Sequence, residues 1–171
     1  SSIPTYALIA MGAGQDRRAL TSSFNYLVMG TIGATFFVIG VGFLYMATGT
    51  LNMADLAARL SELHGNRVVE IGFAFILVGL GLKAALFPLH LWLPGAYAYA
   101  PSFVTTFLAA TATKVAFYGI IRFSFDVFSV ENGFVLNSFT YVITPLAIAG
   151  MIIASAQALF QSDVRRLLAY S

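Results

Sequence analysis

Four long apolar segments, separated by short polar links, constrain this chain more than any other feature. The hydrocarbon core of a bilayer is about 30 Å thick, and roughly 20 residues of helix are needed to cross it. Each of the four segments is long enough. The predicted fold class is therefore all-α, a polytopic bundle of transmembrane helices, with spans at about 22–48, 69–97, 101–125 and 138–160.

Composition supports a membrane environment and excludes several kinds of function. Of the 171 residues, 59% are apolar and 9% are charged, against roughly 45–50% and about 25% in soluble proteins. The absence of cysteine excludes cysteine-based zinc and iron–sulfur sites. A net charge of +2 provides no basic field for nucleic acid. No sequence feature predicts a bound redox cofactor or a metal site.

Both ends of the sequence resemble interrupted helices. Residues 1–14 are apolar but too short to span a membrane, and residues 164–171 open a helix that stops. Residues 1–171 are therefore expected to be a partial transmembrane domain of a larger protein. The link at 49–67 alternates apolar and charged residues, which predicts a short amphipathic helix at the membrane surface. The basic residues weakly favour a cytoplasmic location for the turns at 15–21 and 161–166.

Two lysines lie inside the apolar segments, whereas the arginines lie near segment ends. A lysine near the bilayer centre costs roughly 2.5–3.5 kcal/mol, so Lys83 and Lys114 need a compensating role. The alternative is that each side chain extends to the headgroups. Lys114 is about 12 Å of helix from Arg122, a distance that its stem does not comfortably bridge. A desolvated ammonium can release its proton and a guanidinium cannot, so the two lysines predict a water-accessible proton site.

The sequence around Lys83 predicts a break in the second span. Pro88 lacks a backbone donor, and its ring is expected to clash with the carbonyl of Ala84 and so open the helix. His90 follows Lys83 by seven residues, near the same face of an ideal helix, and is a candidate proton carrier. A histidine that is merely hydrogen-bonded in a helix interface is the alternative. Trp92, Tyr97 and Tyr99 are expected to be interfacial belt residues.

On the third span, Thr111 precedes Lys114 by three residues, which places the two side chains next to each other on a helix. Threonine hydroxyls can also bond back to their own helix, so the other hydroxyls of this span carry no prediction.

The stretch "LKAALFPLHLWLPGAYAYAPSFVTTFLAATATKVAFYGIIR" resembles the antiporter-like subunits shared by respiratory complex I and the Mrp-type cation/proton antiporters. The pieces "SSIPTYALIAM", "DRRAL", "LYMATGTLNMADLA" and "QSDVRRLLAYS" extend the resemblance over nearly the whole chain, and "TGTLNMADL" favours the D-type Mrp protein. The resemblance implies about fourteen transmembrane helices with two inverted repeats, each containing a discontinuous helix.

By motif, Lys83 matches the family's lysine on the broken helix, Lys114 the lysine that leads to the centre, Pro88 the break, and His90 the histidine of "P-x-H-x-W-L-P". The resemblance also implies a glutamate partner for Lys83, expected within about one helical turn before Ser1. The chain departs from the family pattern in having glycine and tyrosine at positions 95 and 97, where an acid and a histidine are common.

The predicted function is that of a proton-conducting membrane transporter subunit, working by sodium or potassium/proton antiport through Lys83, Lys114 and His90, with Thr111 in support. The alternatives are a proton-translocating subunit of NADH:quinone oxidoreductase or of a related membrane-bound hydrogenase, and a scaffold subunit that carries no protons. Enzyme activity is expected only within such an oxidoreductase. The expected partners are other membrane subunits in a bacterial cytoplasmic membrane.

Overall fold

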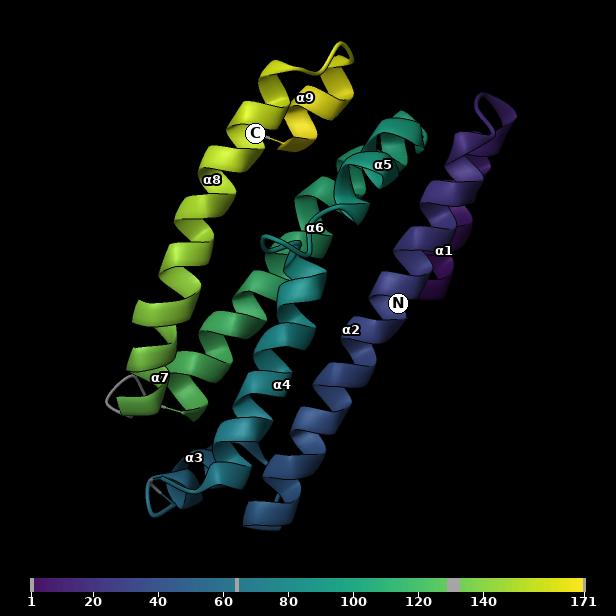
Figure 1. Ribbon diagram of the computed structural model, residues 1–171. Coiled ribbons are helices and arrows are strands. Elements are labelled where there is room, and N and C mark those ends of the chain that lie inside the picture. The colour runs from purple at the N-terminus through teal and green to yellow at the C-terminus, as the bar shows by residue number, and fades with distance from the viewer. Residues whose placement is uncertain (1, 64, 129–132, 171) are drawn as a thin grey trace.

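The computed structural model describes residues 2–63, 65–128 and 133–170. Within these ranges every regular element is a helix, which confirms the all-α prediction (Figure 1). The predicted links at 49–67 and 126–133 lie partly outside the described residues. The helices are α1 (Ser2–Ala10), α2 (Arg18–Thr48), α3 (Met53–Leu60), α4 (Arg67–Ala84), α5 (Trp92–Tyr99), α6 (Ser102–Ile121), α7 (Gly133–Ser138), α8 (Thr144–Leu159) and α9 (Val164–Tyr170), with a 3-10 turn at Met11–Gly14 and π-helical turns at Arg122–Val127 and Phe139–Ile143.

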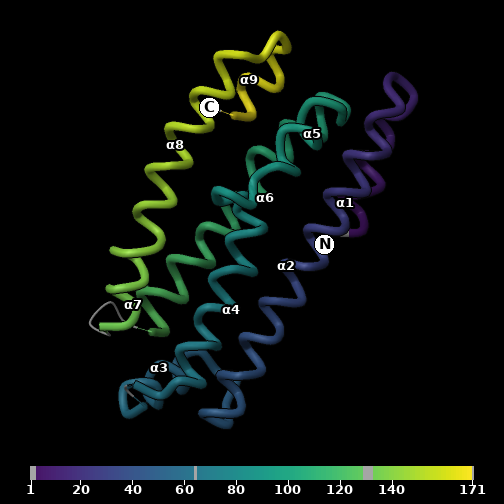
Figure 2. Tube along the Cα trace, viewed as in Figure 1, coloured from purple at the N-terminus to yellow at the C-terminus, as the bar shows by residue number. Residues whose placement is uncertain are grey.

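Among the described residues, three stretches are long and apolar enough to cross a membrane, namely Arg18–Thr48, Ser102–Val127 and Gly133–Leu159. The segment expected at 69–97 is divided instead. Helix α4 has 18 residues and carries Arg67, Glu70 and Lys83, and residues 85–91 separate it from the eight residues of α5. A discontinuous helix is therefore present where the sequence predicts one, as Figure 2 shows between the lower and upper teal segments.

Helices α2 and α4 pack antiparallel through two pairs of glycines. A Cβ atom on Gly40 would lie 2.7 Å from the carbonyl oxygen of Gly72, and one on Gly79 would lie 2.7 Å from that of Gly33. Such distances leave no room for any side chain, so the two backbones are in contact. The seven-residue spacing within each helix puts both pairs on one face, because seven residues are close to two helical turns.

Helix α3 closes one end of the bundle. It begins at Asn52, whose side chain accepts a hydrogen bond of 3.0 Å from the backbone N–H of Ala54, a typical N-cap. Its apolar side chains Leu56 and Leu60 are buried in a core cluster with Phe73. The amphipathic pattern at 49–67 is thus present, but its apolar face packs against the bundle.

The opposite end gathers α5, α9 and the turn between α1 and α2 (Figure 1). Helix α9 packs on α5, and Arg165 of α9 donates a hydrogen bond of 2.9 Å to the hydroxyl of Ser102 at the start of α6. The start of α2, the start of α6 and helix α9, which are far apart in sequence, therefore lie at the same end of the bundle.

Candidate functional site

The break after α4 is made by a left-handed residue at Ala85, where φ is 57°. The backbone N–H of Leu86 donates to the carbonyl of Gly81 at 3.0 Å, and that of Ala85 donates to the carbonyl of Leu82 at 3.4 Å. These two bonds form a Schellman cap, which satisfies carbonyls that the end of a helix leaves free. The helix therefore ends three residues before the Phe87–Pro88 peptide bond, which is cis. The expected clash of Pro88 with the carbonyl of Ala84 is not what ends it, although Pro88 lies inside the break.

A tryptophan from the far side of the break completes the cap. The indole N–H of Trp92 donates a buried hydrogen bond of 3.0 Å to the carbonyl of Leu82. Trp92 is 8% exposed, and its ring meets that of Tyr26 edge to face, with centroids 5.3 Å apart. The expectation that Trp92 is a belt residue is therefore wrong, because its one polar atom is used inside the protein.

Lys83 occupies the last turn of α4, next to this cap, and is half-buried. It lines a cavity of about 420 Å³ between α1, α2, α4, α5 and α6, whose polar lining side chains include Thr5, Tyr26 and Thr111. Within the described residues, no side chain or carbonyl forms a hydrogen bond or an ion pair with the Lys83 ammonium. Most of the cavity lining is apolar, but a space of this size has room for on the order of ten water molecules, which can solvate a cation beside the few polar side chains.

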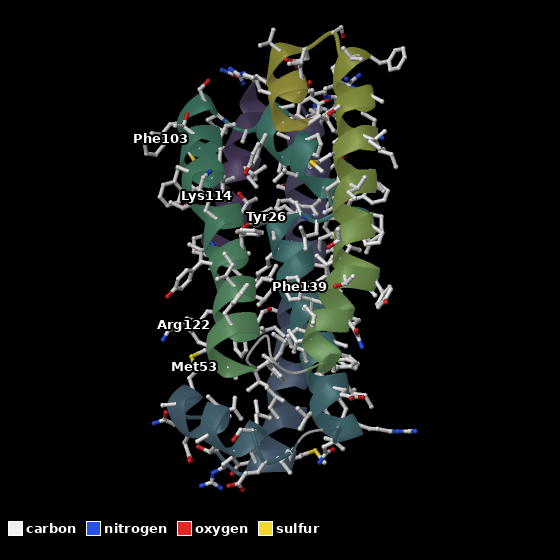
Figure 3. The ribbon with its side chains drawn as sticks, turned by 90° about the vertical axis from the view of Figure 1, so that its left-hand side faces the viewer. Tyr26, Met53, Phe103, Lys114, Arg122 and Phe139 are labelled. Carbon is white, nitrogen blue, oxygen red and sulfur yellow. The ribbon has the colours of Figure 1, made fainter. Side chains whose placement is uncertain are left out.

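Thr111 and Lys114 face different surroundings although both lie on α6. Thr111 lines the cavity of Lys83 and donates its hydroxyl hydrogen bond to the carbonyl of Phe107 at 2.8 Å. Lys114 does not line that cavity. Its ammonium reaches back along α6 and donates to the carbonyl of Ala109 at 2.6 Å, on the exposed face that Figure 3 shows. The structure therefore brings Thr111 to Lys83 and leaves Lys114 apart.

His90 lies within the break and lines a second cavity, of about 530 Å³, together with Ser155 and Tyr170. Its ring is 5.5 Å from that of Phe87 and 6.4 Å from that of Tyr170, between centroids. Both ring nitrogens are buried and have no hydrogen-bond partner among the described residues. Buried polar atoms of this kind are normally satisfied by protein groups or by ordered water.

The expected relation between Lys83 and His90 does not hold. Seven residues put two side chains on one face only if the helix is continuous, and α4 ends at Ala84. The two residues consequently line separate cavities.

No carboxylate forms an ion pair with either lysine in the described ranges. The ion pairs found there join Asp55 to Arg59 at 3.1 Å and Arg122 to Asp126 at 3.3 Å, near α3 and the end of α6 (Figure 3). No cluster of three or more metal-binding side chains occurs in residues 2–63, 65–128 and 133–170. The chemistry that the cavity side chains offer is proton exchange between an amine, hydroxyls and water.

Tyr26 and Thr5 were not predicted as site residues, yet both line the cavity of Lys83. For Tyr26 a signal exists in the sequence, since it precedes by four residues Gly30, which lines the same cavity. A polar ring and a small residue one turn apart are typical of a helix face that approaches a cavity.

Comparison with known proteins agrees with this architecture. The chain is 45% identical over 171 residues to the N subunit of an NADH-quinone oxidoreductase of Desulforudis audaxviator, and 34% identical over 169 residues to the D-type protein of a Na(+)/H(+) antiporter of Bacillus subtilis. These alignments cover 100% and 99% of this chain and 33% of each relative, so the chain spans about a third of their length. A solved structure of the membrane-bound sulfane sulfur reductase, an archaeal respiratory membrane complex, contains a similar chain with a TM-score of 0.85 and 36% identity, covering 99% of this chain and 34% of that one. Because the family model described as "NADH:quinone oxidoreductase/Mrp antiporter, TM" matches residues 1–171, the chain belongs to that family of membrane proteins.

Proposed function

We propose that this segment is part of a proton-conducting membrane subunit in which Lys83 gains and releases the transported proton. The observation that carries the proposal is a half-buried lysine at a helix break, whose ammonium has no partner in the described residues, beside a cavity with hydroxyls. Burial in general disfavours the charged form of an amine and nearby water favours it, so a site that offers both is suited to reversible proton exchange.

His90 and Lys114 are the proposed neighbours of Lys83 in the proton path. The ring nitrogens of His90 are buried without a hydrogen-bond partner among the described residues, and an imidazole can take up and release a proton near neutral pH. The Lys114 ammonium, bonded to the carbonyl of Ala109, has to leave that bond before it can approach the cavity. Side-chain rotation of this kind is fast compared with transport, so it does not prevent a relay.

Two specific activities fit such a subunit, and they differ in the source of energy that drives proton movement. The motif "TGTLNMADL" favours exchange of protons for sodium or potassium. The higher identity, 45% against 34%, favours the second activity, in which the subunit works in an NADH:quinone oxidoreductase or a related redox complex. Under either proposal the chain assembles with other membrane subunits in a bacterial cytoplasmic membrane.

The test is proton transport by the full-length protein and its complex in proteoliposomes, with Lys83→Ala, Lys83→Arg and the control Arg67→Gln. Arg67 is an exposed cation at the other end of α4. Both Lys83 variants should lower the rate by about 100-fold or more, the contribution typical of a positioned proton-transferring group. The control should transport normally. Full activity of Lys83→Arg would contradict the proposal, because a guanidinium keeps its proton.

The same preparations distinguish cation/proton antiport from redox-driven proton movement. Antiport predicts that the complex restores growth of a sodium-sensitive host and that a sodium gradient alone drives proton movement. The redox proposal predicts proton movement only when an electron donor and a quinone are supplied.

A further inference from the structure

Two arginines from opposite ends of the chain meet at one tyrosine hydroxyl. Arg18, the first residue of α2, donates from Nη1 to the Tyr99 hydroxyl at 3.4 Å. Arg166 of α9 donates to the same oxygen from Nη2, and its guanidinium carbon lies 5.2 Å from the centroid of the Tyr99 ring. Three helices therefore supply one cluster, which we name the Tyr99 cluster after Arg18, Tyr99 and Arg166.

The hydrogen-bonding capacity that remains free in the Tyr99 cluster consists only of donors. A tyrosine oxygen has two lone pairs and one hydrogen, and both lone pairs are engaged by the guanidiniums. The remaining hydroxyl hydrogen, and the other N–H groups of the two arginines, can only donate. Such a set of donors is satisfied by an oxygen-rich acceptor, and two adjacent cations favour one that is anionic.

The acids near the Tyr99 cluster do not fill that role. An Asp16 carboxylate oxygen accepts the backbone N–H of Arg18 at 2.9 Å, and an Asp163 oxygen accepts that of Arg165 at 2.9 Å. Asp16 attracts Arg18 electrostatically, but in the described ranges no carboxylate lies within ion-pair distance of either arginine of the cluster. The excess of positive charge at this end is increased by Arg17 and Arg165.

The depth of the Tyr99 cluster identifies the source of the anion. Arg18 begins one membrane-spanning stretch and Ser102, bonded to Arg165, begins another. The cluster therefore lies where helices leave the hydrocarbon, at the level of lipid headgroups. Beside it, exposed apolar side chains project outward and can contact acyl chains, notably Leu20 and Phe103, the latter 80% exposed and labelled in Figure 3.

We propose that the Tyr99 cluster binds the phosphate of an anionic phospholipid of the leaflet at this end of the bundle. Basic pockets between transmembrane helices on the cytoplasmic side are suited to such headgroups, and the distribution of arginines favours a cytoplasmic location for this end. The bound phosphate joins α2, α5 and α9 at their shared end. The site is independent of proton transport by Lys83.

The test is native mass spectrometry of the full-length protein incubated with phosphatidylglycerol or with phosphatidylcholine. We expect phosphatidylglycerol to be retained in preference. Losing a charge-assisted hydrogen bond to the phosphate should weaken retention about tenfold or more, in Arg18→Gln and in Arg166→Gln alike. Arg17→Gln, an exposed arginine on the same turn without a bond to Tyr99, serves as the matched control and should retain the lipid.

Tyr99→Phe keeps both cations and removes only the shared hydroxyl, so it tests the cluster with the smallest risk to folding. It should weaken phosphatidylglycerol retention while leaving the melting temperature in phosphatidylcholine unchanged. Equal loss in Arg17→Gln would indicate general surface attraction and overturn the proposal. Competition by millimolar inorganic phosphate would assign the site to free phosphate, and the absence of any preference for phosphatidylglycerol would show that a protein carboxylate fills it. Either result overturns the lipid site.

Discussion

The indole of Trp92 holds the carbonyl of Leu82, one residue before Lys83, by a buried hydrogen bond of 3.0 Å. This bond crosses the break, so it fixes the end of α4 relative to the start of α5. Lys83 is the neighbour whose position depends most directly on it.

Replacing the indole N–H donor tests how much this hydrogen bond contributes to the stability of the protein. Trp92→Phe keeps an aromatic ring but leaves the Leu82 carbonyl with only the long bond from Ala85, and should destabilise the protein by about 1–2 kcal/mol. Thermal unfolding of the full-length protein measures this effect. Tyr26→Phe, which keeps the edge-to-face ring contact, is the control and should melt close to the unmodified protein. Equal melting of both variants would mean that the hydrogen bond contributes little.

The glycine pairs of α2 and α4 make a second prediction. In Gly40→Ala the new methyl group would meet backbone atoms of Gly72 and Ile76 at 2.7 and 2.8 Å, and the helices would have to separate. Overpacking of this kind costs about 1–3 kcal/mol. Gly42→Ala lies on the same helix with no described atom within 4 Å, and should stabilise by about 0.5–1 kcal/mol because alanine is the better helix former. Melting temperatures that shift in the same direction would contradict the glycine contact.

Ala85 allows a third test, because a left-handed conformation tolerates some side chains and not others. Ala85→Val should destabilise by more than about 1 kcal/mol, since a β-branched residue at positive φ is strongly disfavoured. Ala85→Gly should change stability little, because relief of strain is offset by greater freedom of the unfolded chain. Chemical or thermal unfolding compares the two, and a harmless valine would argue against the left-handed end.

The Asp55–Arg59 pair of α3, which lies outside the membrane-spanning segments, predicts that the stability of α3 depends on pH. Hydrogen bonds from Arg59 and then Thr50 lower the pKa of Asp55. A carboxyl with a lowered folded pKa stabilises the fold above its unfolded pKa, about 3.9, and this stabilisation is lost as the pH falls through the folded value. The protection of α3 amides against hydrogen exchange, corrected for the intrinsic dependence of exchange on pH, should fall below about pH 4. Asp55→Asn should abolish that dependence and Glu62→Gln should not.

Hydropathy was sufficient to predict the fold class, because the length of an apolar segment reports directly on the thickness of a bilayer. The location of the discontinuity also followed from the sequence, since Pro88 disfavours a continuous helix. Its mechanism did not, because an alanine in the left-handed conformation carries no signal that distinguishes it from a helical alanine.

The arrangement of the site was predictable only along single helices. The spacing of Thr111 and Lys114 fixes their relation on α6, but it does not determine which neighbouring helix each side chain meets. In the fold, Thr111 lines the same cavity as Lys83, whereas Lys114 does not and its ammonium bonds to the carbonyl of Ala109. The belt position expected for Trp92 is wrong for the same reason. Trp92 is buried because it packs against the end of another helix, and the spacing of residues in the sequence gives no information about such tertiary packing.

The backbone contact between α2 and α4 also bears on motion. Backbone atoms, unlike side chains, cannot rotate out of the way, so two helices in backbone contact move as one rigid unit. Helices that meet through side chains can slide past each other. Any rearrangement that changes access to Lys83 therefore leaves the α2–α4 pair intact, and residues 85–91, where the helix is already interrupted, are where the chain can bend beside it.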